Sequence, residues 1–592
     1  MPRSKVAVPS LILAVLPVVA TPLAAQLPAP PVSLAVDGSD APGPARRVPP
    51  GGVGVRKIQQ LIGDRDTTLR IDTRTRTNQF AGIAGTDLCS SFEHKGRLYF
   101  LFGDTNPSGG RDTMTYTTAT SPQDLTFVFP FASGGQFHPI TIPGATHGGF
   151  CIPSGGVSYR DVMYIVYTNN YYAPNGDMET SYMCRSVDDG RNWTNLYRLS
   201  GVGANHDMRN THFINVSMSI VEAAASAGLP YPGQDNLVIF GSGAYRKSAL
   251  YLAAMPAAAI GTRSGLRYFA GFSGGVPQWG AAEAAAVSLK TAASNEIGTN
   301  IGEFSAQLIP ELAKWVTLFR GVKISLADAP WGPFSEPVTL WDAWGNDGYG
   351  DFIHVPRTHR PPYDDFGCTG VSCMTAPEDW GGPYGPYLIP RFTTGHPGDC
   401  QLYFTLSTWN PYTVVLLRAQ WPPRPDPPGQ FEMTIAPWSE PSWQRTPGNW
   451  WRTFERVNTH TGDVVRTMTT WGPRGDGDVG VMWGWLPRDG ENRTLGFYVH
   501  GGHQEVILLE GDGTDVPVTG NFTTIYSDIK AGRYGRVVAC AWGHDDNALD
   551  CRVEWDLRGY ERANLRVVIL DKDTATGWNF VSVGPMTLKR AR

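Results

Sequence analysis

The sequence is poor in charged residues, and the charges that it has nearly balance. Asp, Glu, Lys and Arg make up 17% of the 592 residues, and the formal net charge is −5. A nucleic-acid-binding domain concentrates Lys and Arg on one face, where they neutralise phosphates. We therefore predict that this chain has no nucleic-acid partner.

Long apolar runs are missing after the first 25 residues. No later stretch reaches the roughly 18 apolar residues that a membrane-spanning helix needs, so no membrane insertion is predicted. The chain begins with basic residues at Arg3 and Lys5, an apolar run over 6–20 and small residues up to Ala25. This order is typical of a secretory signal peptide over 1–25 and predicts a secreted, extracellular or periplasmic protein. A retained membrane anchor is the alternative.

Cysteine is scarce, with 8 in the chain, and no Cys-x-x-Cys pair occurs, so we expect no zinc cluster. An oxidising compartment permits disulfides in a secreted chain. The spacing suggests two pairs, Cys540–Cys551 across an expected hairpin and Cys368–Cys373 across a small loop.

Glycine (68 residues), proline (47) and aromatic residues (11%) are abundant, which is typical of many short strands joined by tight turns. A unit of two strands recurs five times: GTDLCSSFEHKGRLYFLFGDT from Gly85, FCIPSGGVSYRDVMYIVYTNN from Phe150, NVSMSIV with NLVIFGSG from Asn215, GEFSAQLIPELAKWVTLFRG from Gly302, and YGPYLIPRFTTGHPGDCQLYFTLSTWNP from Tyr384. Each unit is followed by a third strand and a closing segment. The fold class is therefore expected to be all-β, with a five-bladed β-propeller and helical insertions such as 220–227.

Proline-rich segments divide the chain into domains. Residues 26–55 are predicted to form an extended linker, 56–421 the propeller, and 422–430 (PPRPDPPGQ) a second linker. Residues 431–592 contain alternating strands and are expected to form a C-terminal β-sandwich. This last part begins with many tryptophans, for which carbohydrate binding and packing between domains are both open interpretations.

One turn carries a Ser-x-Asp-x-Gly-x-x-Trp pattern, at Ser186, Asp188, Gly190 and Trp193, which resembles the Asp-box of sialidase-type propellers. In such a hairpin the Asp accepts turn amides, the Gly takes a positive φ and the Trp packs between sheets. We interpret Asp188 as structural.

Acidic residues stand where the repeated strands meet the expected channel. In each blade the first strand starts at one rim and the second returns to it. Asp87 and Asp104 occupy these positions in the first unit, and Glu303 and Arg320 occupy them in the fourth, with the same separation of 17. Converging carboxylates suit glycosidic cleavage, because one must hold a proton while another stays ionised.

The three acids are assigned roles as follows. We predict Glu303 as the general acid and Asp87 as the base, with Asp104 orienting or tuning one of them or exchanging roles with Asp87. A loop cap that accepts backbone amides is the structural alternative for Asp104.

Polar and aromatic residues at the same rim are candidates for substrate binding, because hydroxyl-rich ligands bind polar groups placed around aromatic platforms. They are His147, Asn169, Asn215, Arg320, Tyr384, Tyr387, Arg391 and Trp409. No EF-hand spacing is present, so we expect no cofactor, with a structural calcium ion in the channel as the one exception left open.

Three segments together resemble a known bacterial propeller family: GTDLCSSFEHKGRLYFLFGDT, then IGEFSAQLIPELAKWVTLF, then YGPYLIPRF with LYFTLSTWNPYTVVLLRA. This family was long described as a domain of unknown function. Its characterised members are endo-D-arabinofuranases of glycoside hydrolase family 183, which cut the D-arabinan of mycobacterial arabinogalactan and lipoarabinomannan. The resemblance covers 56–420 and implies hydrolysis of α-D-arabinofuranosyl linkages, with acidic rim residues at Asp87, Asp104 and Glu303. Cys89 departs from the pattern, since it stands where a glycine is expected.

The leading hypothesis is therefore a secreted, monomeric glycoside hydrolase whose partner is a polysaccharide, arabinan. A non-catalytic propeller lectin is the alternative from another class, and it would tolerate loss of the acids. A sialidase-like enzyme is the third hypothesis. Such an enzyme needs three arginines to bind the carboxylate of its substrate, and here they would have to be Arg209, Arg320 and Arg391.

Overall fold

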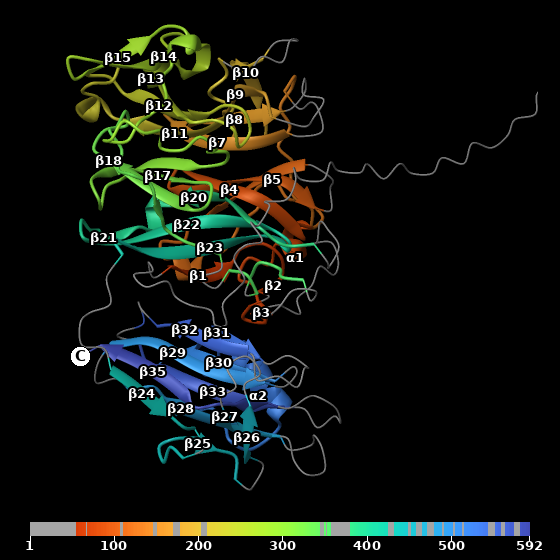
Figure 1. Cartoon of the computed structure of the whole chain (residues 1–592). Coiled ribbons are helices and arrows are strands. Elements are labelled where there is room, and N and C mark those ends of the chain that lie inside the picture. Colours follow the sequence, from red (N-terminus) through yellow and green to blue (C-terminus); the bar gives the residue numbers. More distant parts are fainter. Residues whose placement is uncertain are drawn as a thin grey trace, which may run out of the picture. The chain divides into compact units, whose positions relative to one another are not determined.

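Figure 1 shows the computed structural model of the chain. The structure describes residues 55–66, 68–106, 111–145, 151–169, 178–202, 210–343, 348–350, 352–356, 379–423, 431–437, 439–447, 451–457, 464–470, 479–487, 491–500, 504–511, 514–542, 551–557, 560, 563–572 and 581–591. The predicted signal peptide, most of the first linker and most of the second linker lie outside these residues.

The repeated units form five antiparallel sheets (Figure 1). The first contains β4 (Gly85–His94), β5 (Arg97–Asn106) and β6 (Arg111–Thr117). The second contains β7 (Cys151–Tyr159), β8 (Val162–Asn169), β9 (Thr180–Ser186) and β10 (Thr194–Gly201). The third contains β11 (Asn215–Val221), β12 (Asn236–Ser242), β13 (Leu250–Pro256), β14 (Arg267–Ser273) and β15 (Val276–Gly280).

The fourth sheet contains β16 (Ser305–Ile309), β17 (Lys314–Phe319), β18 (Lys323–Ala327) and β19 (Val338–Thr339). The fifth contains β20 (Pro383–Leu388), β21 (Thr394–His396), β22 (Asp399–Trp409), β23 (Tyr412–Trp421) and β1 (Val55–Gln60). The short elements between strands are β2 (Arg65–Asp66), β3 (Ile71–Asp72), α1 (Thr77–Ala81), η1 (Pro122–Asp124), η2 (Ala223–Ala225), η3 (Ala257–Thr262), η4 (Glu283–Ala285) and η5 (Pro390–Phe392).

The first strands of the five sheets follow one another around a ring. β4 contacts β7, β7 contacts β11, β11 contacts β16, β16 contacts β20, and β20 contacts β4 again. The second strands are mostly buried on both faces, and for this reason β5 contains a continuous apolar run, Leu98–Phe102, rather than an alternating pattern. The expected all-β fold is confirmed, and this arrangement of sheets is propeller-like.

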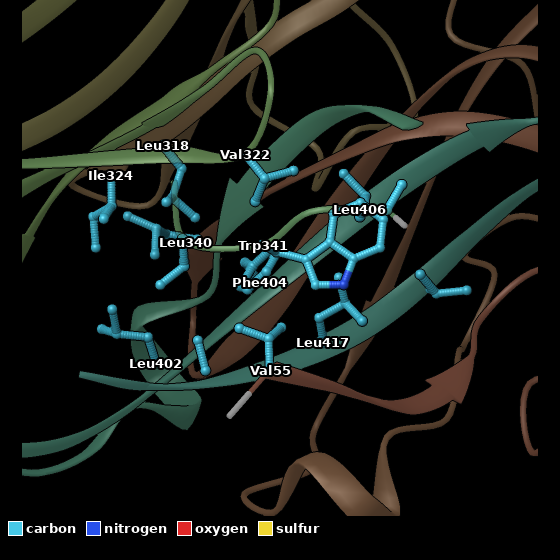
Figure 2. Close-up of a cluster of buried hydrophobic side chains, with 14 of the residues drawn as sticks. Val55, Leu318, Val322, Ile324, Leu340, Trp341, Leu402, Phe404, Leu406 and Leu417 are labelled. Atoms are coloured by element: carbon cyan, nitrogen blue, oxygen red, sulfur yellow. The ribbon is translucent and has the colours of Figure 1, made fainter. Parts of the chain in front are cut away.

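The fifth sheet joins two distant parts of the sequence. β1 pairs antiparallel with β23, so Val55 lies opposite Ala419. Figure 2 shows Val55 of β1 in a buried cluster with Leu318 of β17, Phe404 of β22 and Leu417 of β23. Burying one such side chain contributes about 1.5–3 kcal/mol, so packing as well as pairing holds β1 in the sheet. The repeat pattern did not reveal this closing strand, whose first residue we had assigned to the linker.

One expected insertion is wrong. Residues 220–227 were expected to be helical, but Ile220 and Val221 complete β11, and only η2 follows. Ile220 pairs with Leu237 of β12, so the strand ladder overrides the alanine-rich composition.

The strands after residue 430 form two further sheets. The larger contains β24 (Phe431–Ile435), β26 (Arg452–Val457), β27 (Val464–Thr469), β29 (Glu491–His500), β32 (Cys551–Asp556), β34 (Ser582–Val583) and β35 (Met586–Ala591). The smaller contains β25 (Gln444–Arg445), β28 (Gly480–Trp485), β30 (Glu505–Glu510), β31 (Arg536–Trp542) and β33 (Leu565–Asp571). One buried cluster takes side chains from both sheets, and α2 (Phe522–Lys530) packs on the other face of the smaller one.

Tryptophans of this region mostly serve packing. Trp443 and Trp483 are buried, and Trp451 and Trp485 pack against the same clusters. A Cβ on Gly484 would lie 2.2 Å from the Trp443 indole, so the ring sits directly on that backbone. These tryptophans therefore pack within the C-terminal sheets themselves and do not form an exposed glycan platform.

The predicted Cys540–Cys551 bridge is wrong. Cys540 is a free, buried thiol on β31, which pairs with β30 of the smaller sheet. Cys551 begins β32, which pairs with β29 of the larger sheet, so the expected hairpin between them does not form. Cys368 and Cys373 lie outside the described residues.

Candidate active site

Asp87 and Asp104 lie together where β4 begins and β5 ends. Asp87 is the cross-strand partner of Gly103, and the register shifts on both sides of it. Such bulges bend a strand and redirect its side chains, and they are common beside active sites. The bulged backbone places Leu88 (φ 65°), Cys89 (φ 79°) and Asp104 (φ 27°) at positive φ. Strain of this kind costs about 1–3 kcal/mol per residue and persists where the surroundings enforce it.

Asp87 is buried, with 8% of its surface exposed, and it lies beside two tyrosines. The Tyr384 hydroxyl donates to Oδ2 at 2.8 Å, and the nearby Tyr412 hydroxyl also acts to lower the pKa of the carboxyl. Burial raises the pKa of Asp87 to about 6, because the two tyrosines offset it only in part and the negative charge of Glu303 adds to it. A carboxyl with a pKa of about 6 changes its protonation state near neutral pH.

Asp104 is half-buried, and its neighbourhood favours the neutral acid. Burial, followed by the negative charge of Asp87, raises the pKa of Asp104 to about 8. Two carboxyls this close do not ionise together easily, so one retains its proton.

Glu303 has the opposite environment. Burial acts to raise the pKa of Glu303, but Arg246 more than offsets it and holds that pKa below its ordinary value. The Arg246 guanidinium donates from Nε to Oε2 at 3.1 Å and from Nη2 to Oε1 at 2.9 Å. The Tyr245 hydroxyl donates to Oε1 at 2.6 Å. Our prediction that Glu303 holds the proton is therefore reversed, since this ion pair keeps it ionised.

Arg246 reaches Glu303 because Gly302 leaves room for it. A Cβ on Gly302 would lie 2.8 Å from Cγ of Arg246, and Gly302 has φ +68°. The guanidinium also lies 5.4 Å from the ring centroid of Tyr384, the residue that bonds Asp87. A continuous chain of contacts therefore joins Asp87, Tyr384, Arg246 and Glu303 at one end of the ring.

An apolar layer lies next to the acids. It combines buried residues from strands of different sheets or from just before them: Leu88, Ile152, Met178, Ile214 and Tyr387, with Tyr245 packed against it. Because these side chains fill the space between the first strands, the carboxyls contact protein on this side. A low-dielectric surrounding of this kind strengthens charge interactions.

Some of the predicted substrate-binding residues lie beside the acids, and others lie elsewhere. Tyr384 and Tyr387 belong to the acid cluster, and Trp409 ends β22 beside Gly382. Asn169 and Asn215 are buried at strand ends, and Asn169 donates to the Ala145 carbonyl. Neither amide atom of Asn215 has a hydrogen-bond partner among the described residues. His147 lies outside the described residues.

Neither of the two predicted arginines makes the ion pair with Glu303. Arg391 follows β20 and pairs with Glu93, near the β4–β5 turn. β4 runs away from Asp87 toward Glu93, so Arg391 lies at the opposite end of the strand. Arg320 follows β17, but the ion pair of Glu303 is made by Arg246 instead. Because Arg391 pairs with Glu93 away from Asp87, the sialidase-like cluster of Arg209, Arg320 and Arg391 does not form around the acids. Arg209 lies outside the described residues.

Sequence reasoning missed Arg246, Tyr245 and Tyr412. Tyr245 and Arg246 come just after β12, the second strand of the third unit, at the position that pointed to Asp104 in the first unit. The same positional rule would have found them if it had been applied to every unit instead of to acidic residues alone.

The Asp-box turn matches its prediction. Asp188 accepts the Ser186 hydroxyl at 2.8 Å and the Asn192 amide at 2.9 Å, Gly190 has φ +93°, and Trp193 is buried.

Within the described ranges, no group of three His, Cys, Asp or Glu side chains is arranged to hold a metal ion. No helix in the described part of the chain is both long and apolar enough to cross a membrane.

The chain belongs to the family described as Domain of unknown function (DUF4185), whose model matches residues 72–418. This range lies within the residues that carried the sequence resemblance. Among curated proteins, no match to the sequence is found.

Several solved structures are similar at low identity. The catalytic domain of a GH62 α-L-arabinofuranosidase from Coprinopsis cinerea is 13% identical, with a TM-score of 0.33, and the match covers 63% of this chain and 98% of that one. An α-L-arabinofuranosidase from Podospora anserina is 10% identical (TM-score 0.33; 64% and 99% covered). An exo-β-1,3-galactanase from Phanerochaete chrysosporium is 6% identical (TM-score 0.38; 90% and 99% covered). At these values neither the activity nor the substrate of this chain follows from them.

Proposed function

We propose that this chain is a secreted glycoside hydrolase, an endo-D-arabinofuranase that cleaves α-D-arabinofuranosyl linkages in arabinan. The observation that carries the proposal is that the pKa values of three neighbouring carboxyls are shifted in different directions. Arg246 keeps Glu303 ionised, while burial raises the pKa of Asp87 and of Asp104. Glycosidic cleavage needs this combination of a neutral acid and a carboxylate.

In this mechanism Asp104 is the general acid and protonates the leaving glycosidic oxygen. Glu303, as the carboxylate, attacks the anomeric carbon or activates the water that does so. Asp87 lies next to Asp104, and its negative charge keeps the proton on Asp104 before the reaction. The choice of D-arabinan rests on the sequence resemblance alone, since the family model that matches residues 72–418 describes a domain of unknown function and names no substrate.

The proposal also includes the architecture around the acids. The closed ring of first strands supports a five-bladed β-propeller, and the shared core of the two later sheets supports a C-terminal β-sandwich. We further propose that the protein acts as a monomer and without a cofactor.

Incubation of the purified chain with D-arabinan tests the activity, with released oligosaccharides resolved by size. Internal cleavage gives a ladder of products, and anomeric NMR of the first products assigns retention or inversion. We expect Asp104→Asn and Glu303→Gln to abolish the ladder, whereas Asp188→Asn, in the Asp-box turn, serves as the matched control and leaves it intact. Hydrolysis by both site variants would refute the site, and binding without products by the native chain would favour the lectin.

The pH dependence gives a second test. With Asp104 as the acid, kcat/KM is expected to fall as the pH rises through about 8, the pKa to which Asp104 is raised. The acidic limb reports the ionisation of the carboxylate partner. An alkaline limb that stays in place in Asp104→Glu and in Asp87→Asn alike would assign it to another group, because burial and the charge of Asp87 are what raise the pKa of Asp104.

A further inference from the structure

Glu505 is a buried carboxyl that the proposed mechanism does not use. It begins β30 in the smaller of the two C-terminal sheets, and its side chain is fully buried. Two donors come from α2: the Lys530 ammonium donates to Oε2, and the Tyr526 hydroxyl donates to Oε1 at 2.7 Å. A buried carboxylate is costly unless it is paired and hydrogen-bonded, so each partner of Glu505 matters for stability.

The third partner of Glu505 comes from the propeller-like part of the chain. Arg70, between β2 and β3, donates from Nη1 to Oε1 at 3.3 Å. Its guanidinium carbon lies 3.6 Å from the ring centroid of Trp542, at the end of β31. Burial acts to raise the pKa of Glu505, but the charges of Lys530 and Arg70 more than offset it and hold that pKa below its ordinary value. An ionised Glu505 therefore binds an arginine that is 435 residues away in the sequence.

Other groups of the same loop, residues 68–71, join this contact, and we call this segment the docking loop. The Leu69 carbonyl accepts the Lys530 ammonium at 2.9 Å and the Cys540 thiol at 3.4 Å. The side chains of Leu69 and Ile71 pack against the buried cluster that the smaller sheet forms with α2. The docking loop therefore binds the C-terminal sheets through charge, hydrogen bonds and apolar packing together.

Asp66 connects the docking loop to β1. Its side chain is buried, and Oδ1 accepts the backbone N–H groups of Thr68 and Leu69, each at 3.0 Å. Oδ1 also accepts the Lys57 ammonium at 2.7 Å, and Oδ2 accepts the Gln60 backbone N–H at 3.1 Å. Lys57 and Gln60 belong to β1. The conformation of the docking loop is therefore coupled to the position of β1.

β1 also contacts the C-terminal sheets directly. The guanidinium carbon of Arg56 lies 3.5 Å from the ring centroid of Tyr560, a buried member of the cluster that both C-terminal sheets share. β1 stands at the edge of the fifth sheet, where its neighbour is β23. A strand at the start of a domain is poorly ordered unless further contacts tie it down. The C-terminal sheets supply such contacts.

We propose that the C-terminal sheets hold β1 in the fifth sheet and so keep the ring of sheets closed. They bind the docking loop at Arg70 and Leu69, and Asp66 couples that loop to β1. Tyr560 adds a contact to Arg56. The C-terminal part is thus a structural partner of the propeller-like part and not a loosely attached module. The inference goes beyond the proposed function and does not depend on it.

Hydrogen exchange of the full chain, read by mass spectrometry after proteolysis, tests the proposal. Arg70→Ala removes one donor to Glu505 but leaves the two partners that α2 supplies. We expect the amides of β1 to exchange about 10–100-fold faster than in the native chain, because loss of one partner of a buried ion pair is strongly destabilising and Asp66 carries the effect to β1. Amides of the third sheet should exchange at the native rate.

Arg74→Ala is the matched control. Arg74 makes an exposed ion pair with Asp124 within the propeller-like part, and exposed pairs contribute little, so exchange at β1 should stay native. Glu505→Gln breaks the docking contact from the C-terminal side and should also speed exchange at β1. The double variant with Arg70→Ala should show less than the combined single effects, because both changes remove one contact.

Thermal unfolding shows which variants are folded, and Arg70→Ala decides the question if Glu505→Gln does not fold. Native exchange at β1 in a folded Arg70→Ala would overturn the proposal. Faster exchange confined to the docking loop, or spread equally over all sheets, would also overturn it, because neither result links the C-terminal sheets to the closing strand. An equal increase at β1 in Arg74→Ala would do the same.

Discussion

Asp188 and Asp104 are both aspartates at the end of a strand in neighbouring sheets, yet their surroundings differ. Asp188 is exposed and accepts hydrogen bonds from Ser186 and Asn192, and these bonds outweigh desolvation and lower its pKa. Asp104 is half-buried beside Asp87, and its pKa is raised to about 8. Hydrogen-bond donors around a carboxyl favour its ionised form, which can then stabilise a turn. A buried carboxyl without such donors keeps its proton and can transfer it to a substrate atom.

The largest expected difference between the two aspartates is in activity. Asp104→Asn removes the proposed proton donor and should lower kcat for arabinan hydrolysis by about 10²–10⁴-fold. Asp188→Asn should stay within about twofold, because this turn lies apart from the acid cluster. Initial rates on purified D-arabinan measure both. Equal losses in the two variants would remove the distinction drawn between these aspartates.

A smaller loss is expected when Asp87 is displaced without being replaced. A Cβ on Gly103 would lie 2.8 Å from Oδ1 of Asp87 and 2.9 Å from Cγ2 of Ile152. Gly103→Ala should therefore shift the carboxyl and lower kcat/KM by about 10–100-fold, since displacements of about 1 Å can have effects of this size. Gly261→Ala is the control, because no atom lies within 4 Å of its added Cβ. Native activity in Gly103→Ala would show that the position of Asp87 is not critical.

The two aspartates should also affect stability with opposite dependence on pH. The raised pKa of Asp104 means that its contribution is fully present below about pH 4 and is lost as the pH rises through about 8. Asp104→Asn cannot ionise, so at pH 9 its free energy of unfolding should exceed the native value by about 1.4 kcal/mol, after discounting for solvent contact.

Asp188 gives the opposite sign in the same denaturant titrations. Its lowered pKa means that its contribution is present at neutral pH and is lost as the pH falls below the ordinary range of an aspartate. Asp188→Asn should therefore be destabilised at pH 7 and approach the native chain at pH 3. The same pH trend in both variants would contradict the two environments described.

The smallest effect concerns the strained backbone beside Asp87. Cys89 has φ 79° and is fully buried, at the position where the sequence resemblance led us to expect glycine. Cys89→Gly relieves the strain but empties the space of the thiol, so the free energy of unfolding should change by no more than about 1 kcal/mol. Denaturant unfolding measures this difference. A loss of several kcal/mol would show that packing of the Cys89 side chain contributes more to stability than relief of the backbone strain.

Much of the fold could be predicted from local sequence. The turns at 94–96 and 159–161, the Asp-box turn and the paired strands of each unit follow from short apolar segments and turn residues, which act over a few residues. β1 could not be predicted in this way, because its partner β23 lies more than 300 residues away in the sequence. The Cys540–Cys551 pair failed for the same reason, since the strands that carry them enter different sheets.

The sequence by itself determined which carboxyls approach the ring, because the repeat fixes where each strand starts and ends. Only the tertiary structure decided their protonation. A pKa depends on burial and on charges that arrive from other sheets, and Arg246, from the third sheet, changes the expected role of Glu303 in the fourth. Local patterns specify strands and turns, whereas the electrostatics of the site arises from contacts between residues that are far apart in the chain.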